Sequence, residues 1–449
     1  MIIFRIILMI ILFLFFISLF KISSGSLSIT KLNMSSLSFY TILMYCFIGS
    51  CMIFLGFRDH YLVKKASEDA ISKTSIALFY SYLALPLGMI IINRLMGIKK
   101  YNKFYNDYLE RDIVDINTHQ KSIYSIIVTL SFVGFLGLIY TFYKIGYIPI
   151  VKVITEKADT SVLRIQISRG FKGNQYIRNL LVLNMIPNLS YISYVYYRIL
   201  HTKRWKYQFI FLLLLSIICK TLSFEKSPVV IYLFQFYLLE IFLGNIKSIK
   251  KPLFYMCILG TGFLFVYYAT TNYSGGLFTL KSGPIPRLIL TQIATCYLHF
   301  QAFPNIHSYL NGASFPTAIS WIFNTDQSWI RSGRVVMEIF NNSGVKEGTA
   351  GVMNSIYLAE AYANFGIIGI LISPWLVAFI MSIVSNFILK QRKTPMNIVL
   401  YLIVTYTFSN LLIGGFVDFF YNIGLVFSFI LIIGIDLIYR KGKIYVTIW

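Results

Sequence analysis

Three polar residues that could do chemistry stand where an apolar run begins, near the C-terminal end of the chain. Residues 348–370 read GTAGVMNSIYLAEAYANFGIIGI. On a helix, Glu360 and Asn364 are four residues apart and Tyr357 is three before Glu360, so the three share one face. A carboxylate at the mouth of a membrane helix costs free energy unless it is paired or hydrated, so it marks a candidate site. Glu360 could accept a proton from a sugar hydroxyl, or orient one, as a general base does.

Two arginines offer Glu360 a purely structural alternative. Arg331 and Arg334 in WIRSGR are one turn apart if helical, and either could pair with Glu360. The same two side chains could instead bind an anion or the carboxylate of a saccharide. His299 and His307, eight residues apart, show no metal-site spacing, and each is more often structural than catalytic.

A basic segment near the middle of the chain is a candidate phosphate site. Residues 161–178 read SVLRIQISRGFKGNQYIR and contain no acid. Their four cations are Arg164, Arg169, Lys172 and Arg178. The planar fork of arginine matches phosphate oxygens and lysine adds a point charge, so a pyrophosphate at the membrane surface is a good candidate ligand. The alternatives are contact with lipid headgroups or a different topology.

Two further cations lie beside apolar segments. Lys226 in SFEKSP precedes Pro228, which suits the first turn of a helix, and a helix N-terminus with a lysine beside it attracts anions. A tight outer turn with solvated charges would explain Lys226 equally well. Arg287 in GPIPRLIL opens an apolar stretch, where it could snorkel to the surface or point into a cavity.

The elements that must position these residues are membrane helices. The 449 residues are 57% hydrophobic and only 13% charged, and the apolar residues gather in runs long enough to cross a bilayer. We therefore predict an all-α, polytopic integral membrane protein, with residues 1–449 as a single membrane domain. The eleven predicted spans are 2–20, 37–57, 75–95, 122–146, 179–200, 207–223, 228–244, 253–271, 363–389, 396–413 and 419–438. The first is expected to be a retained helix, because it lacks the charged start and cleavage site of a signal peptide.

The basic residues predict the orientation. The net charge of +23 is read as retention of Lys and Arg on cytoplasmic loops, and no nucleic acid is expected as a partner. A cytoplasmic C-terminus then puts residues 147–178 and 272–362 outside. The large extracytoplasmic loop 272–362 is predicted to carry amphipathic or re-entrant helices, with Trp321 and Trp329 at the membrane surface. Gly366 and Gly369 would let a neighbouring helix approach closely.

Several motifs of other classes are missing from the sequence. It contains no Walker A sequence, GxSxG, HExxH or DxD-type metal pair. Their absence argues against an ATP-driven pump, a serine hydrolase, a zinc protease and a nucleotide-sugar transferase. No metal site and no cofactor is predicted.

The C-terminal half resembles the oligosaccharide repeat-unit polymerases, the Wzy-type O-antigen and capsule polymerases of bacteria. A basic loop is followed by PRLILTQIATCYLHFQAFPNIHSYLNGASFP (286–316) and then by the segment 348–370. The matching residues are Arg287, Gln292, Phe303, Pro304, Gly312, Glu360, Tyr362, Asn364, Phe365, Gly366 and Gly369. Many members carry Arg-Gly where this chain has Lys226-Ser227, which keeps the cation but loses the bidentate geometry.

The resemblance implies a metal-independent glycosyltransferase in the bacterial inner membrane. Such enzymes move a growing glycan from undecaprenyl pyrophosphate to the non-reducing end of a lipid-linked repeat unit at the outer face. It implies Arg164, Arg169, Lys226 and Arg287 as pyrophosphate ligands and Glu360 as the base or acceptor-orienting group. A flippase and a chain-length regulator of the same pathway would be partners.

Three other functions stay open on the sequence. An O-antigen ligase-like transferase would share the lipid donor and the external site. A lipid-linked oligosaccharide flippase or other transporter commonly shows internal repeats and charges at the membrane midplane, and neither is evident here. The third is a non-catalytic scaffold of an envelope assembly complex.

Overall fold

The computed structural model describes most of the chain. The described residues are 2–115, 120–149, 152, 167, 170–222, 227–246, 248–250, 253–254, 257–258, 260–262, 280–281, 283–323, 328–348 and 350–440. Within these ranges every regular element is a helix, which agrees with the predicted all-α class. Contacts divide the chain into two compact units. Unit 1 contains residues 1–106, 268–387 and 404–422, and unit 2 contains residues 107–267, 388–403 and 423–449.

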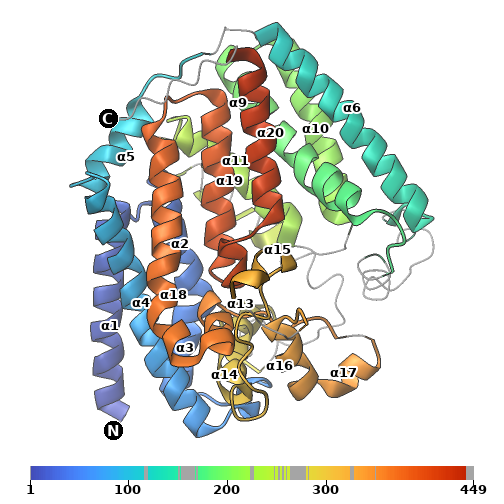
Figure 1. The fold of residues 1–449 in the computed structure, drawn as a ribbon. Helices are drawn as coiled ribbons and strands as arrows, with labels where there is room; N and C mark the ends of the chain where they lie inside the picture. The colour runs from blue at the N-terminus through green and yellow to red at the C-terminus, as the bar shows by residue number, and fades with distance from the viewer. Residues whose placement is uncertain are drawn as a thin grey trace. The chain divides into compact units, whose positions relative to one another are not determined.

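Unit 1 begins with long apolar helices (Figure 1). They are α1 (Ile2–Ser24), α2 (Met34–Ile42), the π-helical turn η2 (Leu43–Phe47), α3 (Ile48–Phe54) and α4 (Glu68–Leu95). Polar caps set where these helices begin. The Asn33 side chain accepts from the Ser36 N–H and Ser36 returns a bond to the Asn33 N–H, while Ser67 caps α4. The amphipathic α5 (Tyr101–Glu110) follows and ends in unit 2.

The segment 284–346 of unit 1 forms a group of shorter helices. They are α13 (Pro284–Ile289), α14 (Thr291–Ala302), α15 (Thr317–Ser320), the 3₁₀ turn η5 (Trp321–Phe323), α16 (Ser332–Phe340) and α17 (Asn342–Lys346). Figure 1 shows α13 and α14 near α3, with α16 next to α14 and α17 beyond α16. α14 packs against α4, η2 and α16, and nine of its twelve residues are buried. It is therefore a core helix of unit 1.

α18 (Tyr357–Lys390) is bent sharply near its start. Gly366 has φ 57° and ψ −135°, so the backbone leaves the helical region there and divides the helix in two. The first part folds back onto the second, because a Cβ atom on Gly369 would lie 2.1 Å from the carbonyl oxygen of Ala361. The close approach at Gly369 therefore comes from the same helix. The prediction that these two glycines admit a neighbouring helix was wrong.

Unit 2 is a second helical bundle. It contains α6 (Gln120–Ile145), the π-helix η4 (Ile177–Met185), α9 (Ile186–Leu200), α10 (Lys203–Thr221), α11 (Ser227–Phe242) and α20 (Ile423–Arg440). α9 packs against α10 and α11, and η4 packs against α6 and α20. A part-buried ion pair with a 2.7 Å N–O distance joins Arg198 of α9 to Glu240 of α11. α19 (Pro395–Leu411) begins in unit 2 and ends in unit 1, where the 3₁₀ turn η6 (Val417–Phe419) follows it.

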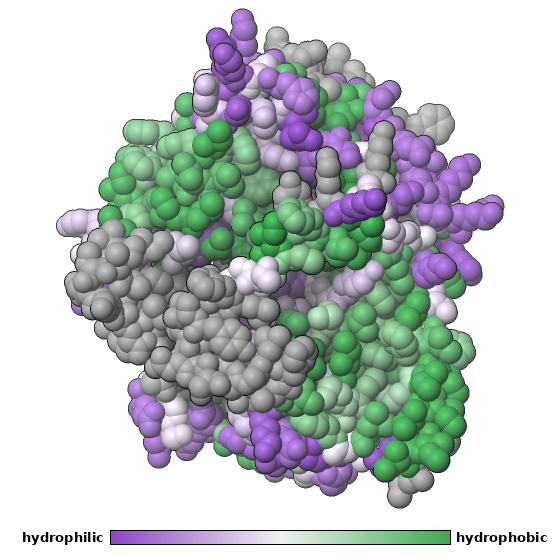
Figure 2. Space-filling view, turned by 180° about the vertical axis from the view of Figure 1, so that it is seen from behind, coloured by the Kyte–Doolittle hydropathy of each residue, from purple (hydrophilic) through white to green (hydrophobic). Residues whose placement is uncertain are grey.

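Six of the described helices are long and apolar enough to cross a membrane. They cover 2–31, 34–54, 68–95, 120–145, 357–390 and 417–437. Figure 2 shows α1 as a continuous hydrophobic surface, with Ile3 and Phe4 74% and 70% exposed, as side chains facing lipid would be. The eleven-span count is not confirmed. Four of the other five predicted spans coincide with α9, α10, α11 and α19, and 253–271 lies largely outside the described residues.

Candidate functional site

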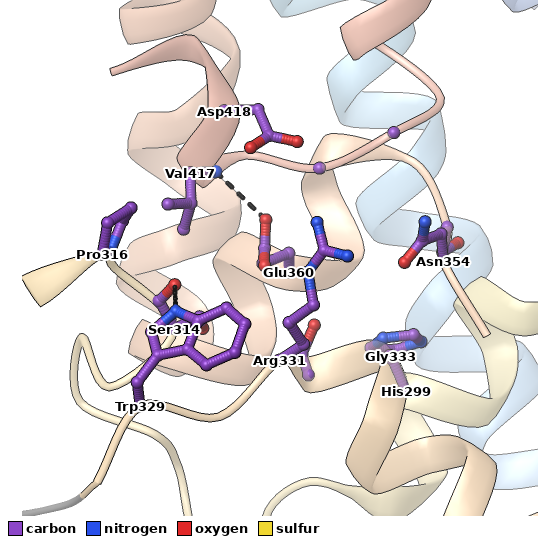
Figure 3. A pocket seen from close by; sticks show the side chains of 14 residues that line it. His299, Ser314, Pro316, Trp329, Arg331, Gly333, Asn354, Glu360, Val417 and Asp418 are labelled. Carbon is purple, nitrogen blue, oxygen red and sulfur yellow. Dashed lines mark hydrogen bonds between the residues drawn. The ribbon is translucent and has the colours of Figure 1, made fainter. Parts of the chain in front are cut away.

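A small polar pocket in unit 1 brings together residues from five separate stretches of the chain (Figure 3). It encloses about 60 Å³, which is room for a few water molecules or hydroxyl groups. Its lining consists of His299, Ser314, Pro316, Trp329, Arg331, Ser332, Gly333, Asn354, Ser355, Glu360, Gly414, Gly415, Val417 and Asp418. Three residues that the sequence predicts as functional are among them: Glu360, Arg331 and His299.

Glu360 enters the pocket from the short first part of α18. Its Oε2 atom accepts a hydrogen bond of 3.0 Å from the backbone N–H of Val417, at the start of η6. Gly415 gives the carboxylate its space, since a Cβ atom there would lie 2.7 Å from Oε2. Oε2 is thus fixed by a backbone donor, while Glu360 remains partly exposed to the pocket.

Asp418 and Arg331 face Glu360 across the pocket. Figure 3 shows the three charged groups coming together from η6, α18 and the residue before α16. Arg331 interacts electrostatically with both carboxylates, but among the described residues no N–O distance within 4.0 Å pairs it with either one. The structural alternative, a Glu360 ion pair, is therefore not what the described residues show. Arg334 pairs with Glu338 instead, at 2.6 Å.

His299 supplies a neutral acceptor from the buried helix α14. It is 1% exposed, and its Nδ1 atom lies 2.8 Å from the Thr295 carbonyl, to which it donates. Burial lowers the pKa of His299 to about 4. The imidazole is therefore neutral at physiological pH, and with its proton on Nδ1 its Nε2 atom carries a lone pair. In the part of the chain that the structure describes, Nε2 has no hydrogen-bond partner.

The polar relay behind the pocket begins at Trp329 and runs through Ser314 and Asn364 to the Glu360 backbone. The Trp329 indole N–H donates to the Ser314 carbonyl at 3.2 Å. The Ser314 hydroxyl lies 2.9 Å from Oδ1 and 2.7 Å from Nδ2 of Asn364, and Nδ2 donates to the Glu360 carbonyl at 2.9 Å. These bonds hold the segment carrying Trp329 against the helix carrying Glu360.

Tyr357 and Asn364 do not line the pocket, although they share a helix with Glu360. The Tyr357 hydroxyl is buried and bonds to the Ser81 hydroxyl at 2.7 Å. Asn364 is fully buried, and its Oδ1 also accepts the Gly312 N–H at 3.1 Å. The three residues on this face therefore meet different surroundings. Tyr357 and Asn364 hold the helix in position, and of the three only Glu360 reaches the pocket.

The remaining predicted residues lie elsewhere. Arg287 is exposed on α13 and does not line the pocket. Lys172 is exposed in unit 2. Arg178, also in unit 2, donates to the Ile167 carbonyl at 3.0 Å and lies over the Phe171 ring at 4.5 Å. Arg164, Arg169 and Lys226 lie outside the described residues.

Sequence reasoning missed Asp418 and Gly415, and it assigned Trp329 to the membrane surface. The stretch GGFVD at 414–418 between two apolar helices held the available signal, since a Gly-Gly turn followed by an acid is unusual there. The arrangement offers two carboxylate acceptors, one guanidinium donor and a neutral imidazole. It suits a ligand with several hydroxyl groups, because each hydroxyl both donates and accepts. Across the described ranges no three His, Cys, Asp or Glu side chains gather as a metal site.

Comparison with known proteins does not assign the chain to a family. The chain matches no protein-family model, no curated protein and no solved structure.

Proposed function

We propose that this protein is a bacterial surface polysaccharide polymerase. It would transfer a growing glycan from undecaprenyl pyrophosphate to the non-reducing end of a lipid-linked repeat unit, at the outer face of the cytoplasmic membrane. The proposal joins the sequence resemblance in residues 286–316 and 348–370 to the pocket, where both segments contribute lining residues. The observation that carries it is the Glu360 carboxylate, held by the Val417 N–H and open to a polar pocket.

In this reaction Glu360 acts on the acceptor hydroxyl. Its carboxylate takes the hydroxyl proton as the oxygen forms a bond to the anomeric carbon of the donor sugar. The bond from that carbon to the pyrophosphate oxygen breaks, and the lipid pyrophosphate leaves with the electron pair. The Val417 N–H donates to Oε2 and keeps the carboxylate oriented.

The charge of the pocket favours the acceptor over the leaving group. Among the described lining residues Arg331 is the one cation, beside the carboxyl groups of Glu360 and Asp418 and the neutral His299, so the lining suits sugar hydroxyls better than a pyrophosphate. The pyrophosphate ligands in this proposal are the four cations that the sequence resemblance implies, Arg164, Arg169, Lys226 and Arg287, none of which lines the pocket. Arginine and lysine side chains would stabilise the leaving charge.

The test is reconstitution with the purified protein and a lipid-linked repeat unit as its only substrate. A ladder of lipid-linked products of increasing length is expected. A ligase-like enzyme would instead need lipid A core as acceptor, and a flippase would move the repeat unit across vesicles without lengthening it. Either result in place of the ladder would overturn the proposal.

A further inference from the structure

Trp329 is a large side chain left in solvent at the edge of the pocket. It is 57% exposed although it lines the pocket together with Glu360 and Arg331. Its indole N–H is already donated to the Ser314 carbonyl, so a ligand meets the aromatic ring and not the N–H group. An exposed indole whose N–H is already bonded offers its apolar ring face to a ligand.

The ring is held in place relative to the carboxylates. The hydrogen bonds from Trp329 through Ser314 to Asn364 and the Glu360 carbonyl connect it to the helix that carries the candidate base. Ser314 and Asn364 are both buried. A rigid aromatic surface beside fixed polar groups binds ligands at low entropic cost.

The size of the pocket determines which part of a ligand enters it. At about 60 Å³ it holds hydroxyl groups but is too small to enclose an entire hexose. Figure 3 shows Trp329 on the Ser314 side, with Arg331, Glu360 and Asp418 beyond it. A sugar ring whose edge hydroxyls faced the two carboxylates would have its flat face over the indole of Trp329.

We infer that Trp329 is the stacking platform for the pyranose ring of the acceptor sugar, whose edge hydroxyls enter the pocket of Glu360, Asp418 and Arg331. A pyranose has an apolar C–H face and a rim of hydroxyls, which matches an aromatic face beside acceptors and a donor. The identification of this sugar as the acceptor rests on the proposed function. Binding of a sugar ring at Trp329 can be measured without any turnover.

The experiment measures binding of one probe to the purified full chain in detergent micelles. The probe is the lipid-free oligosaccharide released by mild acid from the surface polysaccharide of the source cells. Wild type is compared with Trp329→Leu, which keeps apolar bulk without a ring, and Trp329→Phe, which keeps a ring. Trp321→Leu is the matched control, since Trp321 is 75% exposed in the same segment and does not line the pocket.

The inference predicts a Kd about tenfold higher for Trp329→Leu, with Trp329→Phe and Trp321→Leu within about threefold of wild type. Equal binding by wild type and Trp329→Leu would overturn it, and so would no binding to the wild type. If Trp329→Leu does not fold, the test uses Trp329→Phe, Glu360→Gln and Asp418→Asn. The inference is then supported when Trp329→Phe has the Kd of the wild type and the other two variants both bind the oligosaccharide more weakly. Unchanged binding in those two variants overturns it. Ring-dependent binding without polymerisation would support this inference and overturn the proposed function.

Discussion

Gly415 and Glu360 are packed so closely that a Cβ atom on the glycine would lie 2.7 Å from the carboxylate atom Oε2. The position of the carboxylate therefore depends on a residue with no side chain, in the turn between α19 and η6. The same turn presents the Val417 N–H that binds Oε2. Placement of Glu360 is thus decided by backbone from a distant part of the sequence.

Replacing Gly415 with alanine should displace the Glu360 carboxylate. We expect turnover in the polymerisation assay to fall about 100-fold, the effect of moving a catalytic group by roughly an ångström. Gly351→Ala is the control, because no atom lies within 4 Å of its added Cβ and Gly351 does not line the pocket. Equal activity of the two variants would show that the carboxylate is not constrained at Gly415.

Removing the Asn364 side chain should destabilise unit 1. Asn364→Ala leaves the buried Gly312 N–H and Ser314 hydroxyl without their partner, at a cost of about 3 kcal/mol. The midpoint of thermal unfolding in detergent, followed by tryptophan fluorescence, should fall by several degrees. Asn354→Ala, at an exposed position, should melt with the wild type. An unchanged midpoint for Asn364→Ala would mean that the relay contributes nothing to stability.

His299 should make the protein sensitive to acid. The unfolded imidazole binds a proton below about pH 6.5, whereas the folded one stays neutral until about pH 4. Stability is therefore fully present above pH 6.5 and falls by about 3 kcal/mol as the pH is lowered to 4. His299→Gln retains a donor for the Thr295 carbonyl, and its free energy of unfolding should fall less than that of the wild type over this pH range.

The control for this acid sensitivity is His307→Gln. His307 is partly exposed in the same segment, so its replacement should leave the wild-type dependence intact. Parallel pH curves for wild type and His299→Gln, measured as thermal midpoints between pH 7 and 4, would contradict the assignment.

Replacing Arg287 should stop polymer formation without weakening the binding of oligosaccharide in the pocket. In the proposed function Arg287 binds the leaving pyrophosphate, so Arg287→Ala should abolish polymer while single repeat units persist. Arg287 is exposed and does not line the pocket. The affinity of the variant for the free oligosaccharide should stay within about twofold of wild type, since no stacking or hydroxyl contact is removed. Lys281→Ala, a second exposed cation of this segment, should give normal polymer. A normal ladder of chain lengths from Arg287→Ala would remove Arg287 from the site.

The sequence predicted the helical class of the fold, and it singled out one residue, Glu360, that lines the polar pocket. Apolar runs of membrane-crossing length predict the helices, and the cost of a carboxylate beside such a run singles out Glu360. His299 and Arg331 were also named as candidates, and both line the pocket with Glu360. These predictions depend on residue chemistry and on local periodicity, which a single sequence displays.

The rest of the site depends on contacts between distant segments. Asp418 and Gly415 reach Glu360 only because η6 lies against the start of α18, and no local pattern encodes that meeting. The helical face predicted for Tyr357, Glu360 and Asn364 exists, but the break at Gly366 ends the helix early and three different neighbours cover that face. The sequence predicts a place at the membrane surface for Trp329, and it cannot show that the indole N–H is bonded to the Ser314 carbonyl, fifteen residues earlier in the chain.

The central claim is that the Glu360 carboxylate activates the acceptor hydroxyl. Glu360→Gln preserves the shape of the side chain and an oxygen for the Val417 N–H, but it cannot take up a proton. The decisive measurement is the rate of lipid-linked polymer formation by purified wild type, Glu360→Gln and Glu347→Gln, which changes an exposed acid of the same segment. We predict that the rate falls about 100-fold or more for Glu360→Gln alone, with the thermal midpoints of all three proteins alike. Polymer formed by Glu360→Gln at the wild-type rate would contradict it.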